Sequence, residues 1–237
     1  MAEDSRENSL SVFFPCYNEQ DNIRRVYESA RKVLGSLGID HEMIFVNDGS
    51  KDRTGEIADA IAAGDPRVKV VHHPVNRGYG SALQSGFRAA TKRLVFYTDG
   101  DGQFDIGEMP PLLPLMKECD IVSCYRINRQ DNFIRKVNAW CWTKLVCLVF
   151  GMRLRDIDCA FKLYRREIFD TIEMKSTGAL IDTEILARAI RKGYTVRQVG
   201  VRHYPRITGV PTGAKLSVII RAFRELFVLH RQISGKP

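Results

Sequence analysis

The sequence predicts an α/β fold in which a mainly parallel β-sheet is covered by helices on both faces. Through the first 125 residues, short apolar runs alternate with segments of helical periodicity. Parallel strands need such helical crossovers between them, and both faces of the sheet are then buried. Polar turns follow the first four apolar runs, and ligands bind at this carboxyl edge in open α/β sheets. A chain of 237 residues with 44% hydrophobic and 27% charged residues suits one large globular domain, so we expect a single domain over residues 1–237.

Each element of the first half follows from a local pattern. The run before Pro15 is strongly apolar, and proline ends it as a strand because it cannot donate to the sheet. In the next segment Ile23, Val26, Ala30 and Val33 recur at helical spacing. By the same criteria we expect strands at 11–14, 43–46, 68–71, 94–98 and 120–124, and helices at 21–37, 54–63, 80–90 and 106–116.

The pattern changes after Arg126. A long, very apolar helix is expected at 132–150, and it contains Trp140 and Trp142. A strongly amphipathic helix is expected at 214–232. Between them we expect a strand at 158–164, a helix at 182–192 and one or two short strands within 194–204.

Charge and composition restrict the classes of partner. The net charge is +8, yet the segment from Arg188 to Pro237 alone holds eleven Lys or Arg residues against Glu225. Such a basic end favours phosphates or an anionic membrane surface. Nucleic acid is not expected, because zinc-finger spacing and aromatic-rich RNA-binding motifs are absent.

Cysteine usage and the apolar segments indicate a compartment. The six cysteines form no Cys-x-x-Cys pair and sit mostly in apolar runs, which is typical of buried thiols in a reducing environment. The polar first residues do not look like a signal peptide, and the longest apolar stretch, 137–150, is too short to span a bilayer. We therefore expect a cytoplasmic protein.

The most informative stretch is Asp99-Gly100-Asp101, which follows directly on an apolar run. Adjacent carboxylates repel and are costly to bury, so two of them at the end of a strand favour a ligand site. Taken alone, the motif is equally typical of a solvated turn rich in Asp and Gly. In an extended backbone, Asp99 and Asp101 lie on the same side and can bind one divalent cation. Gly100 would let an anionic ligand approach the main chain closely.

The other strand ends also carry polar turns. Asp48 follows the second run, and 76–80 follows the third. The first turn has no glycine, so the dinucleotide-binding pattern is absent, and there is no P-loop. The histidines, including His72, His73 and His203, show no ligand-like spacing, and we assign them no chemistry.

These motifs resemble the family 2 glycosyltransferases of the GT-A fold, and most closely the dolichyl- or polyprenyl-phosphate hexose synthases, such as the mannose synthases. The resembling segments are SVFFPCYNEQDNI, FVNDGSKDRT, NRGYGSALQSGF, YTDGDGQFD, the Arg126 region and HYPRITGVPTGAKL, in the order found in that family. The resemblance implies a Rossmann-like GT-A sheet with C-terminal amphipathic helices. It also implies a nucleotide-sugar-binding half at 1–125 and an acceptor-binding, membrane-facing half at 126–237.

The resemblance also implies roles for individual residues. Asp48 would hold the nucleobase, while Asp99, Asp101 and Gln103 would hold Mg²⁺ or Mn²⁺ and the diphosphate. Asp101 and Arg126 would be catalytic. The full expected nucleotide-sugar set is Pro15, Tyr17, Glu19, Val46, Asp48, Asp99, Gly100, Asp101 and Gln103. Arg126, Arg135, Arg206 and Lys215 would bind the diphosphate and the acceptor phosphate.

The implied reaction is an inverting transfer of a hexose from a nucleotide sugar to a polyprenyl or dolichyl phosphate at the cytoplasmic membrane face. GDP-mannose is the first donor expected and UDP-glucose the second. A metal and basic side chains would stabilise the leaving diphosphate. A phosphate monoester is already anionic near neutral pH, so it hardly needs a general base. A small membrane partner subunit is a further possible partner.

Other interpretations stay open at this point. Asp48 could cap the helix that begins near Thr54, and the basic residues could be ordinary surface charges. The two late apolar helices could be buried core rather than membrane-facing. A transferase with a soluble saccharide acceptor would need a base, for which Asp182 or Glu184 is available. A non-catalytic, membrane-associated nucleotide-sugar-binding protein is the alternative of another class.

Overall fold

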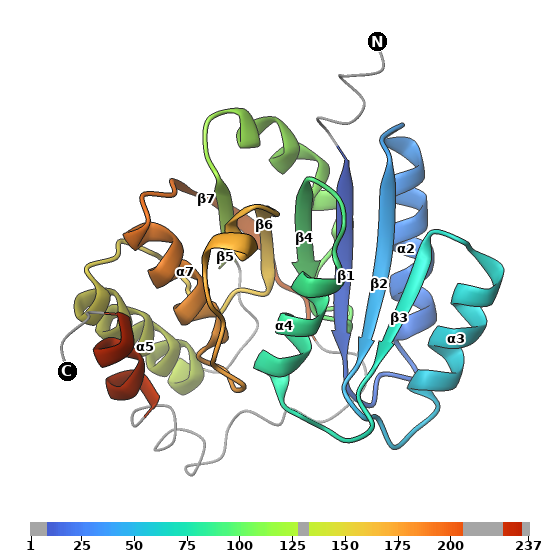
Figure 1. The fold of residues 1–237 in the computed structure, drawn as a ribbon, viewed down its shortest axis with the longest axis horizontal. Coiled ribbons are helices and arrows are strands. Elements are labelled where there is room, and N and C mark those ends of the chain that lie inside the picture. Colours follow the sequence, from blue (N-terminus) through green and yellow to red (C-terminus); the bar gives the residue numbers. More distant parts are fainter. Residues whose placement is uncertain (1–8, 128–132, 206–224, 234–237) are drawn as a thin grey trace.

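The computed structural model describes residues 9–127, 133–205 and 225–233, with the backbone alone at 133–135. The described residues form one seven-stranded sheet in the order β3-β2-β1-β4-β6-β5-β7 (Figure 1). Its strands are β1 (Leu10–Cys16), β2 (His41–Asn47), β3 (Val68–His72), β4 (Leu94–Thr98), β5 (Ile121–Ile127), β6 (Phe161–Arg165) and β7 (Val196–Arg202).

The first four strands are parallel, and β6 is the exception in the sheet. It runs antiparallel to both β4 and β5, whereas β5 and β7 pair in parallel. The sheet is thus mostly parallel, which confirms the predicted fold class.

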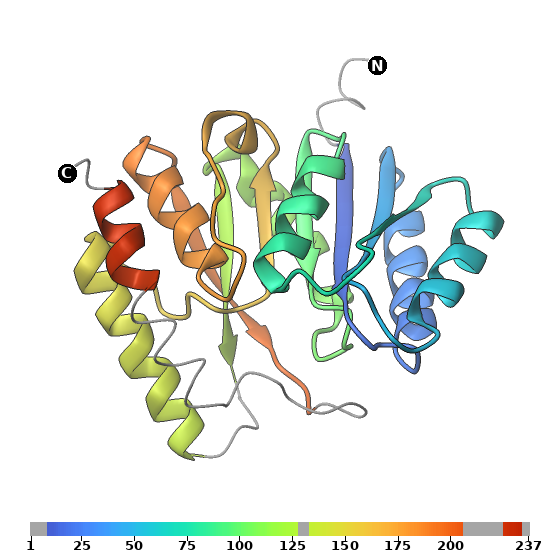
Figure 2. The same cartoon turned by 60° about the horizontal axis from the view of Figure 1, so that its bottom comes forward.

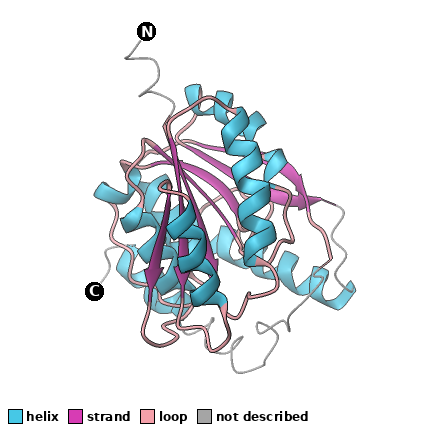
Figure 3. Cartoon of the chain, turned by 90° about the vertical axis from the view of Figure 1, so that its right-hand side faces the viewer, coloured by secondary structure: helices cyan, strands magenta, loops and turns pink. Residues whose placement is uncertain are grey.

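Helices cover both faces of the sheet (Figure 3). The helices are α2 (Ile23–Ser36), α3 (Thr54–Gly64), α4 (Tyr79–Ala89), α5 (Phe133–Phe150), α6 (Ile168–Thr171) and α7 (Ile181–Arg191). Residues 225–233 are also helical and lie beside α5 (Figure 2).

The alternation of side chains along each strand divides the core in two. Phe13 and Tyr97 point to the face covered by α4, α5, α7 and the helix at 225–233. Phe14 and Phe96 point to the opposite face, which α2 and α3 cover. Because both faces are buried, the strands read in the sequence as continuous apolar runs rather than as alternating ones.

Two expectations differ from the structure. The helix expected at 106–116 is replaced by two 3-10 segments, Ile106–Glu108 and Pro110–Lys117. Three prolines, including Pro114 inside the second segment, remove the backbone donors that a regular α-helix needs. The strand expected at 158–164 begins only at Phe161. The helix expected at 214–232 is described from residue 225 onward, and its earlier part lies outside the described residues.

No helix within the described part of the chain combines the length and the apolarity needed to cross a bilayer.

Candidate active site

Polar residues from three strand ends meet in one cavity of about 530 Å³ at the carboxyl edge of the sheet. The sheet order brings the ends of β2, β1 and β4 side by side, although about fifty residues of sequence separate the second from the fourth strand. Backbone bonds fix this junction, because Asp48 N donates to Cys16 O and Gly100 N donates to Pro15 O. The cavity is lined by Pro15, Cys16, Tyr17, Glu19, Asp48, Asn76, Gly78, Tyr79, Ala82, Asp99, Gly100 and Asp101.

Asp99 and Asp101 stand at the β4 end of this cavity. Tyr79 donates its hydroxyl to Asp99 Oδ1 at 3.0 Å, and the backbone N–H of Gln103 donates to Asp101 Oδ1 at 3.0 Å. Burial and the neighbouring Asp101 carboxylate raise the pKa of Asp99 to about 8. The fold therefore holds two acids together in a place that disfavours their charge.

This pair fits a divalent cation. Within the described residues there is no group of three or more His, Cys, Asp or Glu side chains that could hold a metal ion by itself. Mg²⁺, however, is commonly held by one or two carboxylates together with substrate phosphates. A cation would also offset the repulsion between Asp99 and Asp101. The two carboxylates thus suit a metal that arrives with, or is completed by, a phosphorylated ligand.

Gln103 lies beside this pair but outside the cavity lining. Its side-chain amide donates to Tyr204 O at 3.0 Å, and its backbone carbonyl accepts from Tyr204 N. The amide oxygen is the atom through which it could bind a cation. The contacts also tie the turn after β4 to the chain that follows β7.

Asp48 stands at the β2 end of the cavity and is 3% exposed. It does not cap the helix that begins at Thr54, because Asp52 accepts from that residue's N–H at 3.0 Å. Asp48 instead accepts hydrogen bonds from the backbone N–H groups of Arg77 and Gly78 and lies 2.6 Å from Nδ1 of His73. The capping alternative is therefore wrong.

The other residues expected to bind the nucleotide sugar differ in how far they are buried. Tyr17 is exposed at the cavity, whereas Glu19 is buried and accepts from the Asn22 side chain at 2.6 Å. Val46 is fully buried in the core on the α4 side of the sheet and does not line the cavity. Gly100 has a structural reason to be glycine, because a Cβ there would lie 2.6 Å from Cys16 Sγ.

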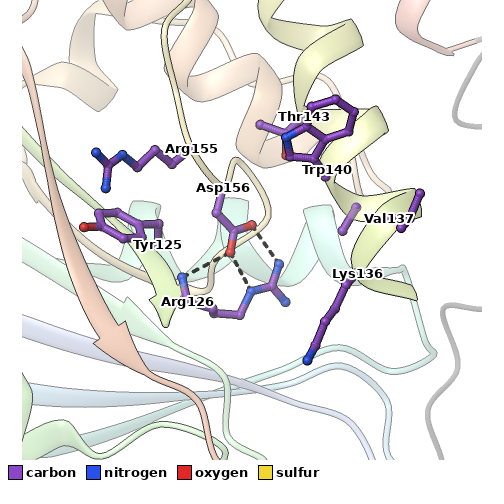
Figure 4. A pocket seen from close by; sticks show the side chains of 9 residues that line it. Tyr125, Arg126, Lys136, Val137, Trp140, Thr143, Arg155 and Asp156 are labelled. Atoms are coloured by element: carbon purple, nitrogen blue, oxygen red, sulfur yellow. Dashed lines mark hydrogen bonds and ion pairs between the residues drawn. The ribbon is translucent and has the colours of Figure 1, made fainter. Parts of the chain in front are cut away.

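Arg126 lies in a second cavity, of about 580 Å³, between the end of β5 and α5 (Figure 4). Its guanidinium donates two bonds of 2.7 Å to the two oxygens of Asp156. Burial opposes the charge of Arg126, but these bonds outweigh it and raise the arginine pKa above its ordinary value. The side chains of Lys136 and Trp140, both on α5, line the same cavity.

The other expected phosphate-binding residues are less well placed. Arg135 belongs to the first turn of α5, where the structure describes the backbone alone. Arg206 and Lys215 lie outside the described residues.

Neither alternative base lines the first cavity. Asp182 is buried and accepts from Lys162 Nζ at 2.6 Å and from the Tyr97 hydroxyl. Glu184 is fully buried, where it accepts from the backbone N–H groups of Lys175 and Ser176 and pairs with Arg188. Both carboxylates thus hold structural contacts.

Sequence reasoning missed several partners of these residues. His73 follows β3 at the same edge of the sheet as the other polar turns, and that position was the signal that spacing rules overlooked. Asp156 and Lys162 gave no such signal, because their partners lie 30 and 20 residues away in the sequence.

The fold and the cavity define a class: an α/β protein whose sheet edge presents a pair of acidic side chains suited to a metal and a phosphorylated ligand. Residues 11–173 match the family model described as glycosyl transferase family 2. The chain belongs to this family.

Two relatives show the range of the similarity. The undecaprenyl-phosphate 4-deoxy-4-formamido-L-arabinose transferase of Proteus mirabilis (strain HI4320) is 33% identical over 168 residues, which cover 70% of this chain and 51% of the relative. The dodecaprenyl-phosphate galacturonate synthase of Rhizobium johnstonii (strain DSM 114642 / LMG 32736 / 3841) is 30% identical over 205 residues. These residues cover 85% of this chain and 60% of the relative. The chain thus spans about half the length of the first of these relatives and 60% of the second.

A solved structure supports the fold over nearly the whole chain. The glucosyl-3-phosphoglycerate synthase of Mycobacterium tuberculosis, in complex with Mn²⁺, UDP and phosphoglyceric acid, superposes with a TM-score of 0.74 at 21% identity. The match covers 99% of this chain and 82% of that chain.

Proposed function

We propose that this protein transfers a sugar from a nucleoside diphosphate sugar to a polyprenyl phosphate, with Mg²⁺ or Mn²⁺ bound at Asp99 and Asp101. One observation carries the proposal: a single cavity joins the buried Asp48 carboxylate to the half-buried Asp99 and the buried Asp101. Their strands, β2 and β4, are separated by β1 alone, so the two ends lie on the order of 10 Å apart. That span suits a nucleoside with its base at Asp48 and its diphosphate at Asp99 and Asp101.

The chain's own residues prepare the donor end. Tyr79 holds Asp99, and the backbone of Gln103 holds Asp101, so the two carboxylates stay fixed toward one cation. A bound divalent cation would neutralise the charge that develops on the departing diphosphate. Tyr17 and Pro15 would contact the nucleotide from the β1 end.

A phosphate acceptor agrees with the absence of an available base in the described part of this site. Asp182 and Glu184 are occupied by structural bonds, whereas a soluble saccharide acceptor would need one of them to remove a proton. A phosphate monoester with a second pKa of about 6 attacks without that help. Relatives whose names specify undecaprenyl- and dodecaprenyl-phosphate products or acceptors support the same class of lipid.

The acceptor phosphate would lie near the second cavity. Three cationic side chains line that cavity against one carboxylate, Asp156, which pairs with Arg126. The other two cations are Lys136 and Arg155, and the exposed Trp140 offers an aromatic surface beside them. Arg135, Arg206 and Lys215 remain proposed ligands of the same anion. We place the protein on the cytoplasmic membrane face through α5, with a small membrane partner subunit as a further candidate.

The identity of the nucleotide sugar is a separate part of the proposal. GDP-mannose and UDP-glucose are the two donors considered, and solved relatives are described as complexes with UDP or UDP-glucose.

The test is a transfer assay. The protein is incubated with Mn²⁺, a short polyprenyl phosphate and each of several nucleotide sugars in turn. The mass of the lipid is then measured by mass spectrometry. Asp101→Asn is expected to lower turnover by about 100-fold or more, because it removes a charge that faces the metal. Asp105→Asn is the matched control in the same turn, since the Asp105 side chain accepts from Gly107 N and does not line the cavity. A lipid that gains no sugar from any donor, with soluble acceptors glycosylated instead, would overturn the proposal.

A further inference from the structure

A chain of three side chains lies behind the β2 end of the cavity. His73 Nδ1 is 2.6 Å from Asp48 Oδ1, and His73 Nε2 is 2.9 Å from Ser85 Oγ. His73 is 5% exposed and Asp48 is 3% exposed, so water does not compete for these bonds. Ser85 lies on α4, which packs over β1 and β2.

The bonds fix the protonation pattern of the imidazole. A carboxylate oxygen can only accept, so His73 Nδ1 carries the proton and donates it to Asp48. In the neutral ring Nε2 is then an acceptor, and the Ser85 hydroxyl donates to it. Asp48 thus fixes the tautomer of His73, and Ser85 holds the far side of the ring.

The same bonds leave Asp48 with little acceptor capacity. Its Oδ1 accepts from His73 and from the Arg77 N–H at 2.8 Å, while Oδ2 accepts from the Gly78 N–H at 3.0 Å. A carboxylate has about four lone-pair sites, so one site on Oδ2 is left for a ligand. Asp48 can thus take one more donor, but it cannot offer both oxygens to a pair of donors.

The number of acceptor sites left on Asp48 discriminates between nucleobases. Uracil presents one ring N–H between two carbonyl groups, which a single acceptor satisfies. Guanine presents a ring N–H beside an amino group, and these two parallel donors are best matched by both oxygens of a carboxylate. In this site one of guanine's donors would be buried without a partner, which is costly.

We propose that His73 and Ser85 are positioning residues for the nucleobase, and that they hold Asp48 so that it accepts one N–H from a uridine donor and disfavours a guanosine donor. The inference rests on the proposed function, because it assigns the base end of the cavity to Asp48. It favours UDP-sugars over the GDP-mannose expected first from the sequence.

A purely structural role is the competing interpretation, in which His73 and Ser85 only tie β3 to α4. The chain supplies a matched control in the adjacent residue. His72 bonds Asn47 at 3.1 Å and Asp59 at 3.0 Å, and neither of these bonds involves Asp48. Losing His72 would remove the same kind of local bonds without touching Asp48.

The experiment compares the binding of UDP and GDP by calorimetry in the presence of Mn²⁺, and the KM and kcat for the preferred donor. The wild type is expected to bind UDP at least tenfold more tightly than GDP. His73→Leu should weaken UDP binding by about tenfold or more, because a charge-assisted bond to Asp48 is lost. It should also lower the ratio of the affinity for UDP to the affinity for GDP. KM should rise while kcat changes by less than about threefold, which a merely structural role would not produce.

Three further variants make the result specific. His73→Asn should restore most of the affinity, because its amide can donate to Asp48 from nearly the position of Nδ1. His72→Leu should leave the ratio unchanged. Ser85→Ala, at a partly buried position, serves if His73→Leu does not fold, and it should narrow the ratio by about threefold.

The outcomes separate this inference from the proposed function. A wild type that prefers GDP, or a His73→Leu variant with an unchanged UDP-to-GDP ratio, overturns the inference even if lipid is glycosylated. Selective, His73-dependent UDP binding without any lipid product supports the inference and overturns the proposed acceptor. A wild type that binds neither nucleotide overturns both.

Discussion

At the scale of single residues, the acidic pair exposes a conflict between stability and binding. Desolvation and the neighbouring Asp101 carboxylate raise the pKa of Asp99 to about 8, so in the absence of a cation an ionised Asp99 opposes folding. We expect Asp99→Asn to raise the melting temperature of the metal-free protein by a few degrees. The hydrogen bond from Tyr79 is retained, since the amide oxygen of Asn can still accept it.

The same variant should lose the metal-dependent gain in stability that Mn²⁺ plus a nucleoside diphosphate gives the wild type. Thermal unfolding with and without these ligands measures both effects. Asp40→Asn is the control, because it removes an exposed carboxylate whose ion pair with Lys92 lies at the surface. An Asp99→Asn protein that is less stable without metal, or equally stabilised by it, would contradict this account.

A second residue-level prediction concerns the buried cation beneath the sheet edge. Lys162 is fully buried, and its Nζ donates to Asp182, to the Tyr97 hydroxyl and to Cys159 O. Lys162→Met leaves Asp182 buried without its cation and should lower the free energy of unfolding by about 3–5 kcal/mol. The double variant Lys162→Met with Asp182→Leu should recover a large part of that loss, because no uncompensated charge remains. Urea unfolding tests this, and a cost equal in the single and double variants would argue against a coupled pair.

At the level of single residues, the sequence points to a contact only where the contact is local. Asp99 and Asp101 were recognisable because two carboxylates end one apolar run. The pairing of Asp48 with His73 and of Arg126 with Asp156 was not, since 25 and 30 residues separate the partners and sheet order decides their contact. Asp48 was also open to a capping role, because sequence proximity to Thr54 says nothing of where the carboxylate points.

At the scale of elements, one carboxylate ties together several strands. Glu42 at the start of β2 accepts from Ser11 on β1, from Lys69 on β3 and from Thr91 before β4. Burial alone would raise its pKa, but these hydrogen bonds outweigh burial and lower the pKa of Glu42 to about 2. The Glu42 carboxylate thus joins the amino ends of the parallel strands, and it accepts these bonds in its ionised form.

This gives a pH-dependent prediction. A depressed folded-state pKa contributes stability above the ordinary value of 4.5, and the contribution is lost as the pH falls toward about 2. Glu42→Gln should therefore lower the free energy of unfolding by about 2 kcal/mol at neutral pH. The difference from the wild type should shrink between pH 4.5 and pH 2, as followed by urea unfolding across that range. Glu56→Gln, at an exposed pair with Arg53, should show no such trend, and a pH-independent Glu42 effect would refute the linkage.

Element types followed from periodicity except where proline intervened. The parallel strands and α2, α3 and α4 begin and end within a few residues of the expected positions, because their apolar patterns are regular. The segment from Ile106 to Lys117 has the apolar pattern of a helix, yet its prolines limit it to 3-10 turns. Neither pattern nor propensity could place β6 between β4 and β5, since that order depends on contacts across the whole sheet.

At the scale of the whole molecule, the expected donor and acceptor halves share one sheet. Strand β6, from the later half, pairs with β4 and carries Lys162 beneath the acidic edge. Both proposed substrate sites therefore open from a common framework, the first at the ends of β1, β2 and β4 and the second between β5 and α5. For the proposed membrane-bound acceptor to reach the second cavity, α5 would have to face the lipid.

That requirement leads to the final prediction. The side chain of Trp140 is 60% exposed and that of Leu148 82% exposed on α5, and Phe227 on the neighbouring helix is also exposed. Together with the net charge of +8, these side chains predict binding to vesicles that contain anionic lipid, with weaker binding to neutral vesicles and at higher salt. Leu148→Ser should reduce vesicle binding by about tenfold, because a leucine side chain contributes about 2 kcal/mol on burial. Val75→Ser, at another exposed apolar residue, on the β3–α4 connection, should leave vesicle binding unchanged. Sedimentation with vesicles of stated composition measures the partition, and equal losses in the two variants would mean that α5 is not the surface that meets the membrane.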